Sequence, residues 1–314
     1  MRNWKYLIAA AAVGLAAFLL YRTLSRYSLN ELIAAVTAVP VPSLLAAAGF
    51  AAASYVSLTF FDYLALRYVG RPLPYLKAAL ASFTALSLGH NIGLAALSSG
   101  AVRYRFYSRW GLAAGEVAKV IVFCGVTVGL GLTTLGGAAL LLRSRLAVEI
   151  TGLTHPVIIA LGVACLAVPA IYLILSIFVR QPLRIRRWSL EVPAFRLAIG
   201  QVLIGSINFA FVAACLHQAL AAVTNVAYLG VASVYVIANA TALVSHVPGG
   251  LGVIESVVMY LLPQDNLIGP LLVFRFVYFL APLGLGGILF AVTELVLRRR
   301  SSDTQGDAPV PAKA

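Results

Sequence analysis

Charged residues are scarce in this chain. They make up 11% of its 314 residues, whereas 61% are hydrophobic, and the mean hydropathy is +0.96. A soluble globular domain carries about 25% charged residues, so the composition excludes an ordinary soluble enzyme. Residues 197–254 contain no Asp, Glu, Lys or Arg, and roughly 20 apolar residues suffice to cross the hydrocarbon core of a bilayer. The sequence therefore predicts a membrane protein.

Motifs for catalysis, metal binding and nucleotide binding are missing as well. The sequence has no catalytic carboxylate pair, no Ser/His/Asp spacing, no Walker A motif and no metal-ligand cluster. Its three cysteines, Cys124, Cys165 and Cys215, lie apart in apolar segments, which argues against a disulfide framework or a zinc site. We therefore expect no cofactor, no metal, no enzymatic activity and no direct ATP-driven pumping.

The charge that is present is strongly basic. The formal net charge is +13, but the Lys and Arg residues stand between apolar segments instead of forming a separate basic domain. Anionic lipid headgroups are therefore a nearer partner than nucleic acid.

Apolar segments of membrane-spanning length occur six times. They run over residues 6–21, 42–66, 120–142, 156–179, 197–220 and 267–297. The first resembles a secretion signal, but Tyr21, Arg22 and Thr23 follow it where a cleavage site needs small residues. We interpret it as a retained span.

Two further apolar stretches, 78–99 and 227–263, are interrupted. One contains Gly89-His90-Asn91-Ile92-Gly93 and the other His246-Val247-Pro248-Gly249-Gly250-Leu251-Gly252. Such breaks argue against straight helices, and residues 253–263 are too few to span alone. We interpret both stretches as re-entrant helical hairpins. Their polar backbone is tolerated at membrane depth only if it is buried in protein or lines a wet cavity, which predicts a cavity.

The positions of the basic residues favour this threading. If both hairpins enter and leave on the same side, most of the 23 Lys and Arg residues lie in cytoplasmic segments. Only Arg22, Arg26, Arg143 and Arg145 then lie in outer segments. If the first broken stretch spans the membrane instead, most of the Lys and Arg residues lie in outer segments. We therefore expect cytoplasmic N- and C-termini.

The two hairpins are similar in sequence and opposite in orientation. Thr84-Ala85-Leu86 precedes His90, as Thr241-Ala242-Leu243 precedes His246. Inverted repeats with paired discontinuous helices are typical of transporters, with the binding site near the midplane. The predicted fold is an all-α polytopic membrane protein with six spanning helices plus two re-entrant hairpins in an inverted repeat. It forms one domain over 1–300, followed by a disordered cytoplasmic tail at 301–314.

Arg275 lies within the last predicted span. An arginine at that depth costs ~2.5–3.5 kcal/mol on insertion scales, so it needs a partner. Glu255, four residues beyond the glycine-rich second break, is an acidic residue that we expect at membrane depth, and we predict that the two form an ion pair. The pair is either structural or in contact with substrate.

Three arginines directly follow the first hairpin. Arg103, Arg105 and Arg109 are interleaved with aromatic residues, and guanidinium groups match phosphate oxygens in a planar, bidentate way. The sequence therefore suggests a headgroup-binding cluster. An ordinary positive-inside cluster is the alternative.

Polar side chains also occur around both breaks. His90, Asn91, Asn239 and His246 could line a headgroup path or relay protons. More often such residues cap broken helix ends, where backbone groups have no water to bond with. We favour capping.

Several motifs together resemble a known family. They are residues 100–112 (GAVRYRFYSRWGL), Ser206-Ile207-Asn208, residues 246–255 (HVPGGLGVIE) and residues 274–282 (FRFVYFLAP). In this order they resemble the transmembrane flippase-like domain of the lysylphosphatidylglycerol synthetase (MprF) family, most closely its stand-alone YbhN-like inner-membrane branch. The resemblance covers nearly the whole chain.

The resemblance implies lipid translocation, because in the synthetase the equivalent domain delivers the aminoacylated lipid to the outer leaflet. Only a basic segment and a short polar tail follow residue 297, so we expect no counterpart of the synthetase's aminoacyltransferase domain. For the stand-alone branch the resemblance suggests an anionic lipid such as cardiolipin or phosphatidylglycerol.

These inferences lead to two functional hypotheses. The first is translocation of an anionic or aminoacylated phospholipid across the bacterial inner membrane, with headgroup contacts from the arginine and polar residues named above. The second is a non-catalytic membrane subunit that binds lipid or partners a lipid-modifying, lipid-synthesising or envelope-glycan enzyme.

Overall fold

The computed structural model describes most of the chain after residue 38. The described residues are 30, 33–34, 37, 39–92, 95–179, 183–185, 188–221, 225–245, 247–262 and 267–306. The predicted first span at 6–21, His246 and residues 307–314 lie outside these ranges.

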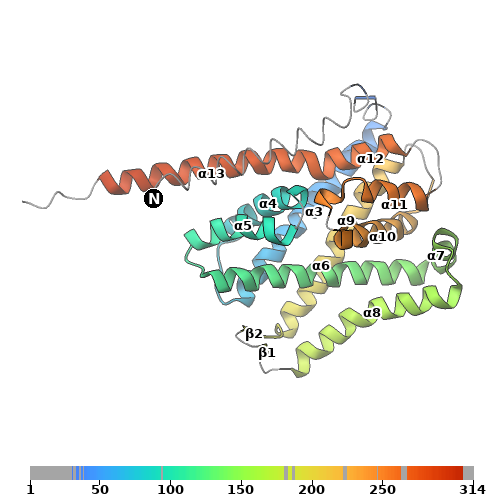
Figure 1. Cartoon of the computed structure of the whole chain (residues 1–314), viewed down its shortest axis with the longest axis horizontal. Helices are drawn as coiled ribbons and strands as arrows, with labels where there is room; N and C mark the ends of the chain where they lie inside the picture. The colour runs from blue at the N-terminus through green and yellow to red at the C-terminus, as the bar shows by residue number, and fades with distance from the viewer. Residues whose placement is uncertain are drawn as a thin grey trace, which may run out of the picture.

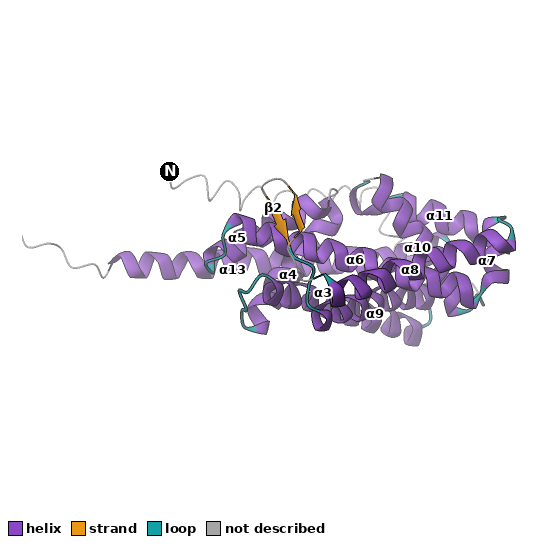
Figure 2. Ribbon diagram, turned by 90° about the horizontal axis from the view of Figure 1, so that it is seen from below, coloured by secondary structure: helices purple, strands orange, loops and turns teal. Residues whose placement is uncertain are grey.

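Helices form nearly all of the described structure (Figures 1 and 2). In chain order the elements are α3 (Val41–Tyr68), α4 (Tyr75–Ile92), α5 (Ala95–Arg109), α6 (Ala114–Leu142), α7 (Ser144–Thr151), α8 (His155–Phe178), β1 (Leu183–Ile185), β2 (Trp188–Leu190), α9 (Phe195–Leu220), α10 (Tyr228–Ser245), the 3₁₀ turn η1 (Pro248–Gly250), α11 (Val253–Leu261), α12 (Ile268–Arg275), the π-helical segment η2 (Phe276–Leu280) and α13 (Ala281–Gly306). The all-α prediction is confirmed. Its one exception in the described residues is the antiparallel hairpin of β1 and β2 between α8 and α9. Helix α13 extends beyond residue 300, where the tail was predicted to begin.

Six described helices are long and apolar enough to cross a membrane. They are Val41–Tyr68, Ala114–Leu142, His155–Phe178, Phe195–Leu220, Tyr228–Ser245 and Ile268–Leu295. Five of them match predicted spans. The sixth, α10, belongs to the stretch 227–263 that the sequence assigned to the second hairpin, and its 18 residues extend about 27 Å at 1.5 Å per residue. Its re-entrant placement therefore stays a prediction.

Both interrupted stretches fold as two helices in contact. Helices α4 and α5 pack together, and Gly89 permits their close approach, since a Cβ there would lie 2.7 Å from the Cβ of Ser99. Helix α10 likewise packs on α11. Between these two helices Gly249 and Gly250 have φ of 60° and 59°, a left-handed conformation that glycine adopts readily. The first interruption begins later than predicted, because α4 continues through Ile92.

The helix pairs pack reciprocally against the long helices. In Figure 1 the pairs α4/α5 and α10/α11 lie between α13 and α6. Helix α4 contacts α13, which follows the second pair, and α10 contacts α6, which follows the first pair. A glycine serves each contact: Gly286 faces Ser87 of α4, and Gly136 faces Val236 of α10. The two helix pairs are thus packed in a reciprocal way, and the inverted repeat itself stays a prediction.

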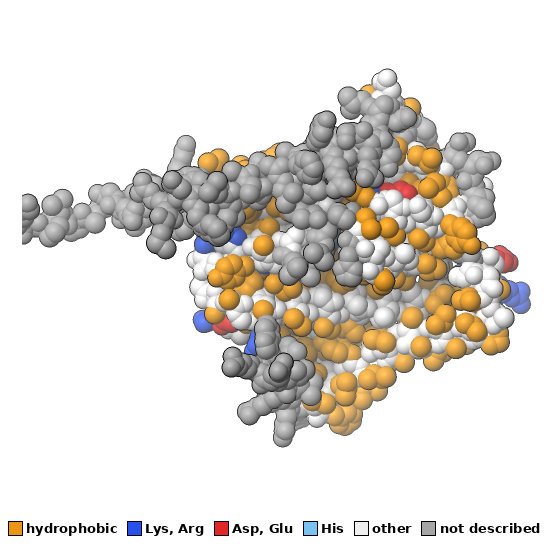
Figure 3. All heavy atoms as spheres, viewed as in Figure 1, with side chains coloured by type: hydrophobic (Ala, Val, Ile, Leu, Met, Phe, Trp, Pro, Cys, Tyr) orange, Lys and Arg blue, Asp and Glu red, His pale blue; other side chains and the backbone are white. Residues whose placement is uncertain are grey.

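Hydrophobic side chains cover the middle of the molecule. In the space-filling view they spread over the face formed by α6, α8 and α10, whereas Lys and Arg side chains appear at the two ends of that face (Figure 3). Helix α8 contributes many of the exposed apolar residues, among them Val163, Ile171 and Ile174, each more than half exposed. An apolar band between charged ends is the surface expected of membrane-spanning helices.

Helices α6 and α9 cross at a pair of glycines. A Cβ on Gly205 would lie 2.5 Å from the carbonyl oxygen of Thr127 and 3.1 Å from the Cα of Gly131. Small residues allow this backbone-to-backbone approach, on which helix association in membranes depends because lipid provides no hydrophobic drive.

We expect Gly205→Ala to destabilise the protein by about 1–3 kcal/mol, because the added methyl group overpacks against backbone that cannot yield. Thermal unfolding of the detergent-solubilised protein measures this loss. Gly129→Ala is the matched control, since a Cβ at Gly129 meets nothing within 4 Å. Equal melting temperatures for the two variants would contradict the proposed close crossing.

Candidate functional site

The two interrupted helix pairs meet where their helices break. A Cβ built on Gly249 would lie 3.5 Å from the carbonyl oxygen of His90, 3.8 Å from the Cα of Asn91 and 3.6 Å from Nη1 of Arg275. Helix α12 ends at Arg275, and π-helical η2 follows immediately. Single π-helical turns within α-helices are frequent at functional sites. We call the meeting point the break junction and define it as His90, Asn91, Gly249, Gly250, Glu255 and Arg275.

Arg275 supplies the donors that the second interruption lacks. Its Nε donates to Oε1 of Glu255 at 2.5 Å, and its Nη1 and Nη2 donate to the carbonyl oxygens of Gly249 and Gly250 at 3.0 and 3.3 Å. The guanidinium carbon lies 5.0 Å from the ring centroid of Phe279. Only 3% of the arginine side chain is exposed. Protein groups therefore replace the water that would otherwise solvate the guanidinium and the broken backbone.

Glu255, the residue expected to pair with Arg275, also caps the start of α11. Its Oε2 accepts a hydrogen bond from the backbone N–H of Gly252 at 2.9 Å, so one carboxylate serves both the ion pair and the helix N-terminus. This arrangement ties α11 to α12 through side chains.

The surface beside the second interruption is apolar. Leu243 and Val244 are 50% and 79% exposed. The hydroxyl groups of the nearby exposed residues Thr241 and Ser245 donate to carbonyl oxygens one turn earlier in α10, at 2.8 and 3.0 Å. Polar groups that bond back to their own helix suit a surface surrounded by hydrocarbon.

Arg103 belongs to a second buried cluster, between α3, α5 and α6. Its Nε lies 2.9 and 3.1 Å from the two carboxylate oxygens of Asp62, and its Nη1 donates to Oγ of Ser99 at 3.0 Å. The hydroxyl of Tyr107 and the thiol of Cys124 also donate to Asp62, each at 3.0 Å. Within the described residues Nη2 of Arg103 has no hydrogen-bond partner. The cluster is thus an electrically neutral pair with one donor to spare.

Arg105 and Arg109 share one carboxylate. Arg105 donates through Nε and Nη2 to the two oxygens of Glu294 at 3.1 and 3.0 Å, and Nη1 of Arg109 lies 2.8 Å from Oε1. The arginine side chains are 20% and 26% exposed, whereas Glu294 is 4% exposed. Two positive charges face one negative charge, so this cluster keeps an excess positive charge that is accessible from outside.

The predicted polar residues separate into different environments. Asn91 donates to the carbonyl oxygen of Ser87 within α4 at 2.9 Å and to that of Phe279 in η2 at 3.4 Å, so capping of a broken helix end by Asn91 stays a prediction. His90 lies beside Tyr55, with ring centroids 6.5 Å apart. Asn239 donates to Tyr235 within α10, at 3.0 Å, away from the interruption.

Two acidic partners of the predicted arginines were missed by sequence reasoning. Asp62 and Glu294 are the partners of Arg103, Arg105 and Arg109, and the sequence analysis named neither. The signal was available, because each is the single acidic residue of a predicted span, 42–66 or 267–297. The reasoning applied to Arg275 holds for them too, since a carboxylate at that depth needs a cation.

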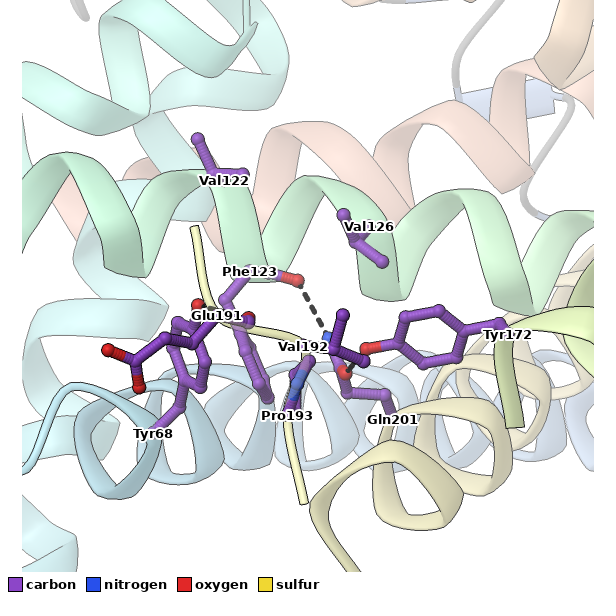
Figure 4. Close-up of a pocket in the computed structure, with 9 residues that line it drawn as sticks. All are labelled: Tyr68, Val122, Phe123, Val126, Tyr172, Glu191, Val192, Pro193 and Gln201. Carbon is purple, nitrogen blue, oxygen red and sulfur yellow. Dashed lines mark hydrogen bonds between the residues drawn. The ribbon is translucent and has the colours of Figure 1, made fainter. Parts of the chain in front are cut away.

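A cavity of about 220 Å³ lies apart from the break junction. It is bounded by α3, α6, α8, α9 and the connection that leads into α9 (Figure 4). The arginines named above do not line it. The headgroup chamber expected between the hairpins stays a prediction.

We expect Glu255→Gln to destabilise the protein by about 3 kcal/mol, because removing one partner leaves a buried charge uncompensated. Chemical or thermal unfolding in detergent measures the change. The matched control is Glu116→Gln. Glu116 also pairs with an arginine, Arg71, at 2.8 Å and accepts a backbone N–H at a helix start, but that arginine is 55% exposed.

An exposed pair contributes about 0–1 kcal/mol, so the control should unfold close to wild type. A loss no larger for Glu255→Gln than for Glu116→Gln would show that the buried pair does not hold the interruption.

Comparison with known proteins found similarity but no family assignment. No family model matches the chain. The uncharacterised protein slr0712 of Synechocystis sp. is 29% identical over 311 residues, which cover 96% of this chain and 97% of that protein. The inner membrane protein YbhN of Escherichia coli is 28% identical over 262 residues, 80% of each chain. Together with the six apolar helices, the similarity to an inner membrane protein supports a multi-pass inner membrane protein.

Proposed function

We propose that this chain moves phospholipid headgroups across the bilayer, in the manner of a flippase. One observation carries the proposal: two interrupted helix pairs meet at their breaks, beside a buried arginine, and the second break is flanked by exposed apolar residues. Backbone that is interrupted at membrane depth marks substrate paths in transporters. The similarity to an inner membrane protein, and the resemblance of the motifs to the flippase-like domain of the MprF family, support the same function.

The charge distribution favours an anionic headgroup. Arg103 and Arg275 are each neutralised by one carboxylate, whereas Arg105 and Arg109 share Glu294. The excess positive charge of that cluster and its accessible guanidinium edges suit a phosphate group, which guanidinium binds in a bidentate way. The headgroup binds there first. The acyl chains stay in the bilayer throughout, so only the polar part of the lipid needs a path.

The spare donor on Arg103 extends this path inward. Its Nη2 is buried and has no partner in the described residues, and a buried unsatisfied donor is costly unless something fills the position. A phosphate oxygen or a water molecule is the natural acceptor. The path thus runs from Arg105 and Arg109 past Arg103 toward the break junction.

The orientation follows from the basic segments. With both hairpins re-entrant, the N- and C-termini and most Lys and Arg residues lie in the cytoplasm. The Arg105/Arg109 cluster then faces the cytoplasmic leaflet, where anionic lipid is loaded.

We expect the double variant Arg105→Gln/Arg109→Gln to lower leaflet exchange of a fluorescent anionic phospholipid at least tenfold. Hydrogen bonds to charged groups contribute about 1.5–3 kcal/mol, and tenfold in rate corresponds to about 1.4 kcal/mol. Exchange is measured in proteoliposomes by quenching the outer leaflet with a membrane-impermeant reductant. Arg71→Gln, which removes an exposed arginine from a surface pair, is the control and should exchange lipid at the wild-type rate.

The double variant leaves Glu294 buried without a partner, so a triple variant that adds Glu294→Gln separates folding from function. The triple variant leaves no buried carboxylate without a counter-charge and should fold, yet still exchange lipid slowly. Wild-type exchange by either variant, in protein that elutes as a single folded species, would overturn the proposal.

A non-transporting membrane subunit is the second candidate. One observation favours it: Arg103 and Arg275 are already neutralised by Asp62 and Glu255, so these two buried arginines carry no excess charge for a lipid phosphate. Such a protein would bind lipid or a lipid-modifying, lipid-synthesising or envelope-glycan enzyme. Stoichiometric co-purification of an enzyme, with no lipid exchange by the wild-type chain, would support this function instead.

A further inference from the structure

The cavity between α3, α6, α8 and α9 has no role in the proposed headgroup path. Its volume of about 220 Å³ exceeds that of an engineered apolar cavity of about 150 Å³ that stays dry and binds benzene. Its walls are mainly apolar: Val122, Phe123 and Val126 of α6, and Val192 and Pro193 of the connection into α9.

The polar groups of Tyr68, Tyr172 and Gln201 in the cavity wall have hydrogen-bond partners, whereas Glu191 is exposed at the rim. The amide nitrogen of Gln201 donates to the carbonyl oxygen of Phe123 at 3.1 Å, and its amide oxygen accepts from the hydroxyl of Tyr172 (Figure 4). The same nitrogen also donates to Oγ1 of Thr127 at 2.9 Å. The hydroxyl of Tyr68 donates to the backbone carbonyl of Glu191 at 2.7 Å. A stable buried water needs two to four polar partners. The walls offer few free ones, so the cavity is suited to hydrocarbon.

The position of the cavity relates it to one membrane surface. Tyr68 is the last residue of α3, and Glu191 is an exposed residue between β2 and α9. Tyr172 and Gln201 each lie six residues from the adjacent helix end, Phe178 and Phe195, which is about 9 Å at 1.5 Å per residue. The cavity therefore extends from the level of the exposed connection to about two helical turns inward.

The cavity is continuous with a lipid-facing surface. Val122 and Val126 are 42% and 39% exposed, and on neighbouring α8 Ile171 and Leu175 are 55% and 44% exposed. These side chains lie on helices that qualify as membrane spans. The cavity thus opens toward bilayer hydrocarbon. At this depth the hydrocarbon consists of the upper parts of phospholipid acyl chains.

We propose that this cavity binds one acyl chain of a bilayer phospholipid, in the leaflet on the side of the β1–β2 hairpin. The chain enters between α6 and α8, with its glycerol end at the level of Glu191. It contacts Val122, Val126 and Phe123, while the Tyr172–Gln201 hydrogen bond closes the inner end. The site is independent of headgroup translocation, because none of its walls belongs to the break junction or to the Arg105/Arg109 cluster.

Photo-crosslinking with a phospholipid tests the site. The full chain is reconstituted in vesicles containing a phosphatidylglycerol that carries a diazirine on the upper part of one acyl chain, and adducts are mapped by peptide mass spectrometry. We expect adducts concentrated on the peptides containing Val122 to Val126 and Val192. Val126→Trp, which fills the cavity, should lower their yield at least fivefold.

Ile174→Trp is the matched control. It places the same bulk on an exposed lipid-facing position of α8 and should leave the yield unchanged. Gln201→Leu is a second test that does not rely on a folded tryptophan variant: it removes the hydrogen bond that closes the inner end, and adducts should appear deeper on α9.

Equal adduct yields on the cavity peptides and on the outer face of α8, or yields unaffected by Val126→Trp in protein that remains folded, would overturn the site. These readouts do not depend on lipid exchange, so a protein that fails to translocate lipid can still show the site.

Discussion

Satisfying interrupted backbone without water is the constraint on which this structure depends. Where α10 gives way to η1, the carbonyl oxygens of Gly249 and Gly250 lose their helical donors. Arg275 provides them from another helix. The arginine in turn needs a counter-charge, and Glu255 supplies it from the helix that follows the interruption. Arg275 and Glu255 thus neutralise each other, cap the start of α11 and provide hydrogen bonds to the interrupted backbone. They also hold the break against the last long helix.

The same logic extends over the rest of the molecule. The buried pair Asp62–Arg103 ties the first helix pair to α3, as Glu255–Arg275 ties the second to α12. Glycines bring the helices close enough for these short-range contacts, at Gly205 for α6 and α9 and at Gly286 for α4 and α13. Buried ion pairs add little net stability compared with apolar packing, and removing one partner is costly. The buried ion pairs therefore determine which helices pack together, and they contribute less to the stability of the fold.

The sequence predicted the helical fold and five of the described spans because length and apolarity are local properties. It also led us to place Glu255 beside Arg275, since each is an isolated charge in apolar surroundings and only 20 positions separate them. Partners farther apart in the chain were not predicted. Arg103 and Asp62 are separated by 41 positions, and Arg105 and Glu294 by 189. Such pairs depend on how helices pack, which periodicity does not encode.

Helix α10 shows most clearly what composition alone cannot predict about membrane topology. Its 18 uncharged residues fit a membrane span, whereas the glycine-rich interruption after Ser245 fits a re-entrant hairpin. Both interpretations predict the same helix, and they differ only in where its end lies relative to the bilayer. The β1–β2 hairpin was not predicted either, because each of its strands has only three residues, too few for an alternating pattern to indicate a strand.

The depth of Ser245 therefore tests the central claim most directly. A nitroxide attached to Ser245→Cys, in a variant whose three native cysteines are replaced, can be measured in vesicles by its accessibility to oxygen and to a water-soluble nickel chelate. Two interruptions that meet within the bilayer predict an oxygen-accessible, nickel-shielded label near the bilayer centre. A nickel-accessible label at headgroup level would show that α10 crosses the membrane completely, and would contradict the account.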